Sequence, residues 1–585
     1  MDSADVRHII TLLKSQNSIK NGTVPAILNN LVYYIPRVQI TSDLVNLCES
    51  FFESTILGDI DPLELFEAGR SIFKWKAQVS EPTIPLSRFF AIWNQCFMNC
   101  KAWTLPKIAI VCGILTLKDE YQVLQKSYFI DDSGHINSMF RSWREDLFMP
   151  LWIGLFKQSL DHHDDLTELL TVFYSTICER NDISKKTMEP LWTVMSYSCI
   201  QLLTKKVYEP YEIILKNKFY MENLNNLTKM LQYSMSKTDT ECISNIFDDL
   251  IEISVNMAQR EEDSSMPNKS YDNPFYSRKF IGLILTIRAC LESRPKYVPV
   301  EWYRKTLVIL FNLNFIAQDF GSVGFESYEF VQSVSIYGLI KDTPNKNMIF
   351  SLINTFQQFT NPGLKYPNKI NDSRVIFLLE FLDGINKRSP QVDFKFLHET
   401  AWPIVSLYLT NRSQDIRENA HTAMLSLLLN TSNDIQSLQW KRNRLLEYSS
   451  MVINQYESGY LSKEQLHVIF ETVGLCLPVI GDLDKDIVMT LLHLVYRAVI
   501  NSSGKDHIIS KELIKCLSYI LPYCDPLHIT DWLDNTSQLS QQSNLSKSDK
   551  EEIWQSMWLV ISMMRNDEAL KWWYLNAAAP DRCRL

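Results

Sequence analysis

Glycine is scarce in this sequence, with 16 residues among 585, although hydrophobic residues make up 46% and aromatic residues 12%. Sheet-rich proteins need many tight turns, and glycine is one of the residues that such turns use most. The composition therefore favours an all-α fold. Because a chain of this length exceeds one compact core, we expect several packed units or one elongated array.

A strong charge of one sign is also missing. The 58 basic and 67 acidic residues give a formal net charge of −9 and are spread along the chain without long blocks. A nucleic-acid groove or a polybasic membrane surface would need basic residues gathered together. The charge pattern therefore argues against nucleic acid as a partner.

Long hydrophobic runs are absent as well. No stretch reaches the ~18 uninterrupted apolar residues that a membrane span requires. The best candidate, Leu147 to Phe156, is short and contains Pro150 and Gly154. The acidic start, Met1 to Asp5, lacks the basic and apolar regions of a secretory signal. We expect no transmembrane helix and, at most, peripheral attachment to a membrane.

Patterns for catalysis or metal binding are incomplete. Cys96 and Cys100 form the one close pair among 12 cysteines, and no second pair completes a zinc site, so we interpret them as core thiols. Asp161 to Asp165 reads as a solvated helix start, because adjacent side chains on a helix diverge. Gly321 to Phe325 lacks the Gly-Lys-Ser/Thr ending of a phosphate loop and is expected to be a turn. The sequence predicts a non-enzymatic protein without cofactor, metal site or small-molecule substrate.

Helix signals recur, whereas strand signals do not. Ser462 to Gln465 has the form of a capping box and precedes apolar residues at helical spacing. An apolar segment, Trp402 to Leu409, precedes a second helix that starts at Ser413 and carries small alanines on its packing face. Such a hairpin resembles a HEAT or armadillo unit, in which stacked helix pairs build an α-solenoid. We therefore predict an irregular α-solenoid of helical hairpins.

Polar, proline-containing stretches suggest the domain boundaries. The expected organisation is an N-terminal helical block at 1–259, a polar linker at 260–276, a central helical block at 277–359, a loop at 360–374, a HEAT-like block at 375–534, a Ser/Gln-rich flexible loop at 535–550, a C-terminal helix at 551–579 and an exposed tail at 580–585.

The tail ends on Cys583, Arg584 and Leu585, which are a small side chain, a cation and a leucine with a free carboxylate. This is the chemistry of the peroxisomal Ser-Lys-Leu address, which a receptor reads while the protein stays soluble. Pro580 stops a helix, and the two residues after it keep the tail solvated. We expect these three residues to bind the receptor for C-terminal peroxisomal signals.

Several segments, taken in order, resemble the fungal peroxin-8 family of peroxisomal import organisers. The segments that carry the resemblance are Leu31 to Val38, Phe73 to Lys76, Val79 to Pro85, Trp93-Asn94, Tyr128 to Ser133, Gly321 to Phe325 with Ser327-Tyr328, and Trp572 to Tyr574. Singly, such aromatic residues are more often packing residues than contacts. The family usually ends in Ser-Lys-Leu, and the Cys-Arg-Leu ending departs from that pattern.

The resemblance implies a scaffold bound peripherally on the matrix side of the peroxisomal membrane. Its expected partners are the docking subcomplex, the RING-finger subcomplex and the cargo receptor, from which it helps cargo to leave. Two alternatives remain open at this point. One is a peroxisomal matrix enzyme with a C-terminal address, and the other is a cytosolic or nuclear HEAT-type scaffold with an accidental tripeptide.

Overall fold

The protein is described by a computed structural model that covers most of the chain. The described residues are 3–14, 24–79, 82–101, 103–127, 133–160, 165–204, 214–263, 274–319, 326–341, 346–364, 368–388, 392–432, 434–502, 507–542, 545–564 and 566–577. Within these ranges every regular element is a helix, and no strand occurs. The all-α prediction is confirmed.

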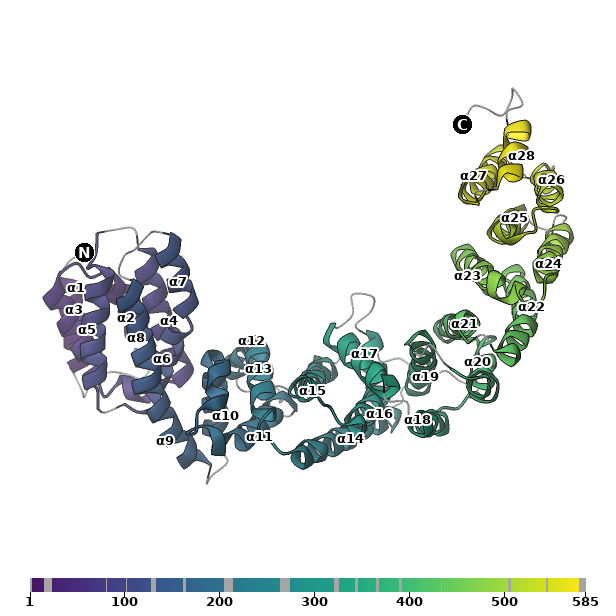
Figure 1. The fold of residues 1–585 in the computed structure, drawn as a ribbon. Coiled ribbons are helices and arrows are strands. Elements are labelled where there is room, and N and C mark those ends of the chain that lie inside the picture. The colour runs from purple at the N-terminus through teal and green to yellow at the C-terminus, as the bar shows by residue number, and fades with distance from the viewer. Residues whose placement is uncertain are drawn as a thin grey trace. The chain divides into compact units, whose positions relative to one another are not determined.

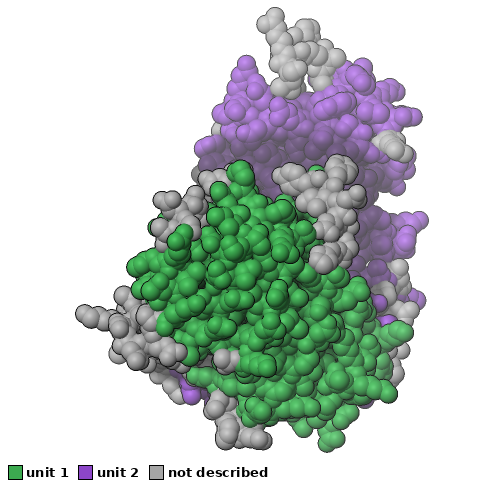
Figure 2. Space-filling view, turned by 90° about the vertical axis from the view of Figure 1, so that its left-hand side faces the viewer, with its two compact units in different colours: residues 1–250, 269–302 green, residues 251–268, 303–585 purple. Residues whose placement is uncertain are grey.

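The chain divides into two compact units, which are coloured separately in Figure 2. Unit 1 comprises Met1–Leu250 and Lys269–Trp302, and unit 2 comprises Ile251–Asn268 and Tyr303–Leu585. The chain passes between the units at three points: inside the helix Thr240–Asp263, at 268/269 outside the described residues, and inside the helix Val300–Ala317. The units therefore do not coincide with the blocks expected from the sequence.

Unit 1 consists of helices of moderate length (Figure 1), and short 3-10 and π segments lie between some of them. Its elements are α1 (Ser3–Lys14), α2 (Val24–Tyr34), η2 (Ile35–Arg37), α3 (Thr41–Glu53), η3 (Leu57–Asp59), α4 (Pro62–Gln78), α5 (Leu86–Asn99), α6 (Leu105–Leu115), α7 (Lys118–Ser127), α8 (Ser133–Ser142), η4 (Trp143–Phe148), α9 (Met149–Ser159), α10 (Asp165–Ile177), η5 (Arg180–Ser184), η6 (Glu189–Leu191), α11 (Trp192–Thr204), α12 (Ile214–Glu222), α13 (Leu224–Met235), the first part of α14 (Thr240–Asp263) and α15 (Pro274–Glu292).

The closest crossing in unit 1 joins α4 to α6. A Cβ atom at Gly69 would lie 2.6 Å from the carbonyl oxygen of Ile110, and one at Gly113 would overlap the carbonyl of Phe66. Only glycine allows two helix backbones to approach so closely. Two of the few glycines in the sequence are thus required by this crossing.

Aromatic side chains fill the core around that crossing. The Phe73 ring lies 5.2 Å from Trp93 and 5.6 Å from Trp143, both nearly perpendicular to it. Trp93 and Trp143 are fully buried. Edge-to-face pairs of this kind add about 0.5–1.5 kcal/mol each to the burial of the rings. The high aromatic content is therefore explained in part by this core.

Unit 2 is more regular. It contains the remainder of α14, α16 (Val300–Ala317, from Tyr303), α17 (Glu326–Lys341), α18 (Lys346–Gln358), α19 (Lys369–Arg388), η10 (Phe396–Ala401), α20 (Trp402–Tyr408), α21 (Gln414–Leu429), α22 (Ile435–Glu457), α23 (Lys463–Gly481), α24 (Ile487–Ser502), α25 (His507–Ile520), η11 (Leu521–Tyr523), α26 (Ile529–Ser540), α27 (Lys547–Met563) and α28 (Asp567–Ala577). From α17 to α27 each odd-numbered helix packs against the next, and α18 to α26 pair with them from the other side (Figure 1). This is the predicted solenoid of helical hairpins.

Both helix signals read from the sequence are confirmed. The Ser462 hydroxyl accepts from the amide of Gln465, whose side chain accepts from the Ser462 amide, which completes the capping box. In the HEAT-like hairpin of α20 and α21, the predicted packing face of α21 is buried. Arg417 donates to the carbonyl oxygens of Asn411 and Tyr460, each at 2.8 Å, and so ties this hairpin to the next.

The prediction of a Ser/Gln-rich flexible loop at 535–550 is wrong for most of this range. Helix α26 continues to Ser540, because Thr536 and Leu539 extend the buried face begun by Trp532. Helix α27 begins at Lys547, because Ser546 and Asp549 form a second capping box. The polar composition reflects the solvated side of two helices rather than a long loop.

Three other expected boundaries also shift. The C-terminal helix expected at 551–579 is two helices, since the Asn566 side chain accepts from the amides of Glu568 and Ala569 and starts α28. The loop expected at 360–374 ends early, at the start of α19, where Asn368 accepts from the amide of Asn371. The linker expected at 260–276 is helical at both ends, through α14 and through α15, which begins with a proline.

In the parts of the chain that the structure describes, no helix combines the length and the hydropathy that crossing a bilayer needs.

Candidate functional site

The predicted receptor-binding residues, Cys583, Arg584 and Leu585, lie outside the described residues. The last described element is α28, which ends at Ala577. The structure therefore leaves the tripeptide as a prediction.

The patterns weighed for metal or phosphate binding are only partly described. Gly321 to Phe325 and residues 161–164 fall outside the described ranges, between helices that end and begin on either side of them. Cys96 is buried, and burial raises its pKa to about 11, while the Cys100 thiol donates to the carbonyl of Phe52 at 3.3 Å. Cys96 is a core thiol, as predicted, whereas Cys100 is only partly buried. In the described part of the chain, no group of three His, Cys, Asp or Glu side chains could hold a metal ion.

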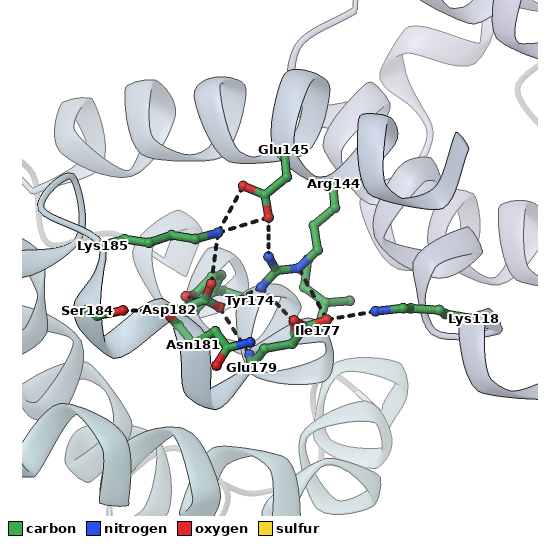
Figure 3. Close-up of polar contacts among 10 residues, drawn as sticks. All are labelled: Lys118, Arg144, Glu145, Tyr174, Ile177, Glu179, Asn181, Asp182, Ser184 and Lys185. Carbon is green, nitrogen blue, oxygen red and sulfur yellow. Dashed lines mark hydrogen bonds and ion pairs between the residues drawn. The ribbon is translucent and has the colours of Figure 1, made fainter. Parts of the chain in front are cut away.

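The most elaborate charged cluster of unit 1 is centred on Arg144 and Asp182 (Figure 3). Arg144 lies in the π-helical η4 segment, and Asp182 lies in the 3-10 segment η5, fully shielded from solvent. The guanidinium Nη2 donates to Asp182 Oδ2 at 2.5 Å. The same oxygen accepts from the Tyr174 hydroxyl at 2.9 Å and from the Glu179 amide at 3.0 Å.

Further charges close this Arg144–Asp182 network. Lys185 lies 3.1 Å from the other oxygen of Asp182, and Glu145 bridges Lys185 and Arg144 at 2.9 and 2.6 Å. Burial opposes ionisation of Asp182, but the hydrogen bond from the Glu179 amide and the charge of Arg144 outweigh it and lower its pKa. Asp182 is buried and contacts three hydrogen-bond donors and the Lys185 ammonium, so its charge is compensated by partners within the chain. It locks η4 to the α10–η5 turn.

A second junction brings together several of the segments that resemble the peroxin-8 family. Lys76, at the end of α4, is buried, and its Nζ donates to the Ile84 carbonyl at 2.7 Å, to the Thr83 hydroxyl at 2.8 Å and to the Pro36 carbonyl at 3.4 Å. Burial lowers the pKa of Lys76 to about 8. The segments around residues 36, 76 and 84 thus share one ammonium group and form one structural unit.

The outer side of this junction is exposed. Arg37 lies 4.2 Å from the centre of the Tyr33 ring and 5.0 Å from that of Trp75, and Trp75 is 46% exposed. On the inner side, the Trp143 indole donates to Asn94 Oδ1 at 2.7 Å. The matched aromatic residues are therefore divided between packing and surface positions.

The aromatic run near the C-terminus is divided in the same way. Trp573 lies 5.1 Å from Trp554 and 5.2 Å from Trp558 of α27, and the Trp572 indole donates to Asp534 at 2.7 Å. Tyr574, in contrast, is 65% exposed. Trp572 and Trp573 hold α28 to its neighbours, as the packing interpretation expects.

Sequence reasoning did not find the Arg144–Asp182 network. Its two central residues are 38 positions apart and stand in no recognisable motif. The one local signal available was the spacing of Glu179 and Asp182, which cap each other in η5.

Comparisons with known proteins show sequence similarity along the whole chain. A family model described as the PEX8 C-terminal domain matches residues 439–582. Peroxisomal biogenesis factor 8 of Saccharomyces cerevisiae is 25% identical over 605 residues, covering 99% of this chain and 99% of the relative. The protein of the same name from Komagataella phaffii is 23% identical over 519 residues, covering 77% and 70%. That of Pichia angusta is 22% identical over 541 residues, covering 83% and 79%.

Among solved structures, the crystal structure of the karyopherin Kap121p bound to the SUMO protease Ulp1p is similar with a TM-score of 0.41 and 10% identity. That alignment covers 97% of this chain and 56% of the karyopherin. The fold assignment rests on the helices themselves. The sequence similarity to relatives named peroxisomal biogenesis factor 8 extends from end to end, and residues 439–582 match the PEX8 C-terminal domain, so the chain resembles the peroxin-8 family along its whole length.

Proposed function

We propose that this protein is a non-enzymatic peroxisome biogenesis factor required for the import of matrix proteins. The observation that carries the proposal is the 25% identity to peroxisomal biogenesis factor 8 of Saccharomyces cerevisiae over 99% of both chains. Because the similarity covers the whole length, it supports a function shared by the whole protein and not only by one common domain.

Within that function, the protein acts as a scaffold on the matrix side of the peroxisomal membrane. It links the docking and RING-finger subcomplexes and engages the cargo receptor to promote cargo release. Stacked helical hairpins suit this work, because each hairpin adds exposed surface without disturbing the others. Exposed apolar side chains on α27 and α28 support a role in protein contacts, namely Trp558, Leu559, Met563, Tyr574 and Leu575.

The tripeptide Cys583-Arg584-Leu585 serves as the peroxisomal address in this proposal. The receptor captures the carboxylate, the Arg584 cation and the Leu585 side chain. Removing Leu585 takes away an apolar contact worth roughly 1.5–3 kcal/mol and displaces the carboxylate. The affinity of the full chain for the signal-reading domain is expected to fall, while Cys583→Ser leaves it equal or higher.

The test is complementation of cells that lack the relative. The full chain should restore import of a fluorescent matrix reporter and should copurify with members of both membrane subcomplexes. Alkaline carbonate should release it from peroxisomal membranes, since protein contacts alone hold it. A chain that stays in the cytosol or nucleus and leaves import defective would contradict the proposal and favour a HEAT-type scaffold elsewhere.

A further inference from the structure

A groove in unit 2 runs between the C-terminal ends of α19 and α21 and the middle of α23. Its volume is about 570 Å³. Asn386, Lys387 and Arg388 line it from α19, Leu425 and Leu429 from α21, and Val468 from α23. These helices are neighbours in the odd-numbered row of the unit (Figure 1). We call this site the α19–α21–α23 groove.

Two asparagines in its lining have unused hydrogen-bonding groups. Asn386 is 5% exposed, and neither its Oδ1 nor its Nδ2 has a hydrogen-bond partner. Asn430, just after α21, is equally buried, and its Oδ1 accepts from the Ser432 amide while its Nδ2 has no partner. Buried polar atoms in native proteins are nearly always paired, so an unpaired set in a groove points to a ligand that completes it.

The chemistry of the unpaired atoms narrows the kind of ligand. A free amide oxygen and a free amide NH₂ on Asn386 match the N–H and C=O groups of a peptide main chain. In a helix those groups are already bonded to one another, whereas an extended chain has them free. The groove is thus suited to an extended peptide.

The charge and the walls of the groove indicate which side chains such a peptide carries. The charged lining residues are both basic and stand in the last turn of α19. Lys387 pairs with Asp383 at 2.7 Å, whereas Arg388 donates to a neutral acceptor, Ser333 Oγ, at 3.1 Å. The opposite wall mixes the hydroxyl side chains of Thr422, Ser426, Thr431 and Thr472 with apolar ones. Of the apolar residues, Leu429 and Val468 are 46% and 57% exposed.

We propose that the α19–α21–α23 groove binds an extended, acidic peptide segment of a partner protein. Asn386 and Asn430 hydrogen-bond its main chain, Arg388 pairs with an Asp or Glu side chain, and an apolar side chain of the peptide packs between Leu429 and Val468. The argument uses the groove alone and does not depend on the role in peroxisome biogenesis.

The test measures binding of short fluorescent synthetic peptides to the full chain. One series has an apolar residue beside Asp or Glu, a second replaces the acids by Asn or Gln, and a third replaces them by Lys. Each series is made with and without a central proline, which prevents helix formation. The acidic series should bind most tightly, and proline should not abolish binding. Tighter binding of the Lys series, or binding by helix-forming peptides alone, would overturn the proposal.

Two variants locate the binding. Arg388→Glu should weaken the acidic series about tenfold or more. Asn386→Ala should weaken all series about tenfold, yet leave the thermal stability of the free chain unchanged or higher, because it removes unpaired atoms. A purely structural asparagine would instead lower the melting temperature.

The matched control is Lys395→Glu, which reverses an exposed charge elsewhere in unit 2. It should leave peptide binding unchanged. If the acidic series binds but neither Arg388→Glu nor Asn386→Ala affects it, the peptides bind another surface and the assignment fails. Binding of anionic lipid vesicles that Arg388→Glu abolishes, with no peptide binding, would identify a membrane surface instead and also overturn it.

Discussion

Each of the two units contains a charged network of its own, and the two networks are built in opposite ways. In unit 1, Asp182 is fully buried and Arg144 is 7% exposed, and irregular η segments carry both. In unit 2, Glu512 of α25 is also buried, but it pairs with His467 of α23 at 2.9 Å and with Lys515 at 3.4 Å, and the cluster extends to solvent at Glu552, which is 45% exposed. We call these the Arg144–Asp182 and Glu512 networks.

The difference follows from the regularity of the helices. Successive hairpins of unit 2 place charged positions of α23, α25 and α27 beside one another, so Lys511 reaches Asp549 at 3.0 Å and Glu552 at 3.1 Å. In unit 1 the carboxylate that gathers its partners at an irregular turn is fully buried, and the acid that would remain beside Arg144 and Lys185 without it, Glu145, is 38% exposed. Loss of Asp182 should therefore cost more stability than loss of Glu512.

The largest expected effect is that of Asp182→Ala. It leaves the buried Arg144 guanidinium with only the partly exposed Glu145 and the more distant Glu179, and breaking a buried ion pair in this way costs about 3–5 kcal/mol. Hydrogen exchange followed by mass spectrometry should show the loss of protection in α10 and η4. Asn181→Ala, at the exposed neighbouring position, is the control and should change protection little. Loss of protection equal in the two variants would show that the network does not hold this turn.

Glu512→Ala should cost less, about 2–3 kcal/mol, although Glu512 is nearly as buried as Asp182. Lys511 keeps Asp549 and Glu552 as partners, and Lys515 keeps Glu552. The loss of exchange protection should be confined to α23, α25 and α27. A cost larger than that of Asp182→Ala would reverse the comparison.

Acid should reduce the free energy of unfolding that the Glu512 network contributes. The expected loss is about 1–2 kcal/mol, a value already reduced for screening by solvent. Burial opposes ionisation, but the hydrogen bond from His467 and the charges of Lys515 and Lys511 lower the pKa of Glu512 to about 2, from an ordinary 4.5. Because the folded-state pKa is the lower one, the stabilisation is complete above pH 4.5 and is lost as the pH falls towards 2.

The measurement is exchange protection of α25 across this pH range, corrected for the intrinsic rate. Glu512→Gln should remove most of the pH dependence, because the titrating group is gone. If exchange protection changes with pH equally in the wild type and in Glu512→Gln, other carboxylates dominate the acid unfolding of unit 2.

The smallest expected effect is that of Ser462→Ala, which removes the capping box at the start of α23. Loss of an N-cap side chain costs about 1 kcal/mol. Protection should fall in the first turns of α23 and not in α25 or α27. Ser462→Asp keeps an acceptor at this position and should behave like the wild type. A loss that spreads along the row would mean that the hairpins of unit 2 do not respond separately.

Much of the helical structure could be predicted from the residues alone, because its causes are local. The capping box at Ser462, the apolar face after Ser413 and the buried thiol at Cys96 all depend on neighbours within a few turns of the chain. The scarcity of glycine and of apolar runs likewise gave the fold class before any contact was known. The loop predicted at 535–550 was wrong, because its polar composition does not reveal the buried face of α26 or the capping box at the start of α27.

The tertiary structure alone decided which distant residues meet. Arg144 reaches Asp182 across 38 positions, and Lys76 collects oxygens from residues 36, 83 and 84, because helix packing brings those backbones together. The unpaired amides of Asn386 and Asn430 share a groove for the same reason. Side-chain types and their spacing determine a helix, but burial and the pairing of charges depend on which helix faces lie against each other, and no local pattern encodes that.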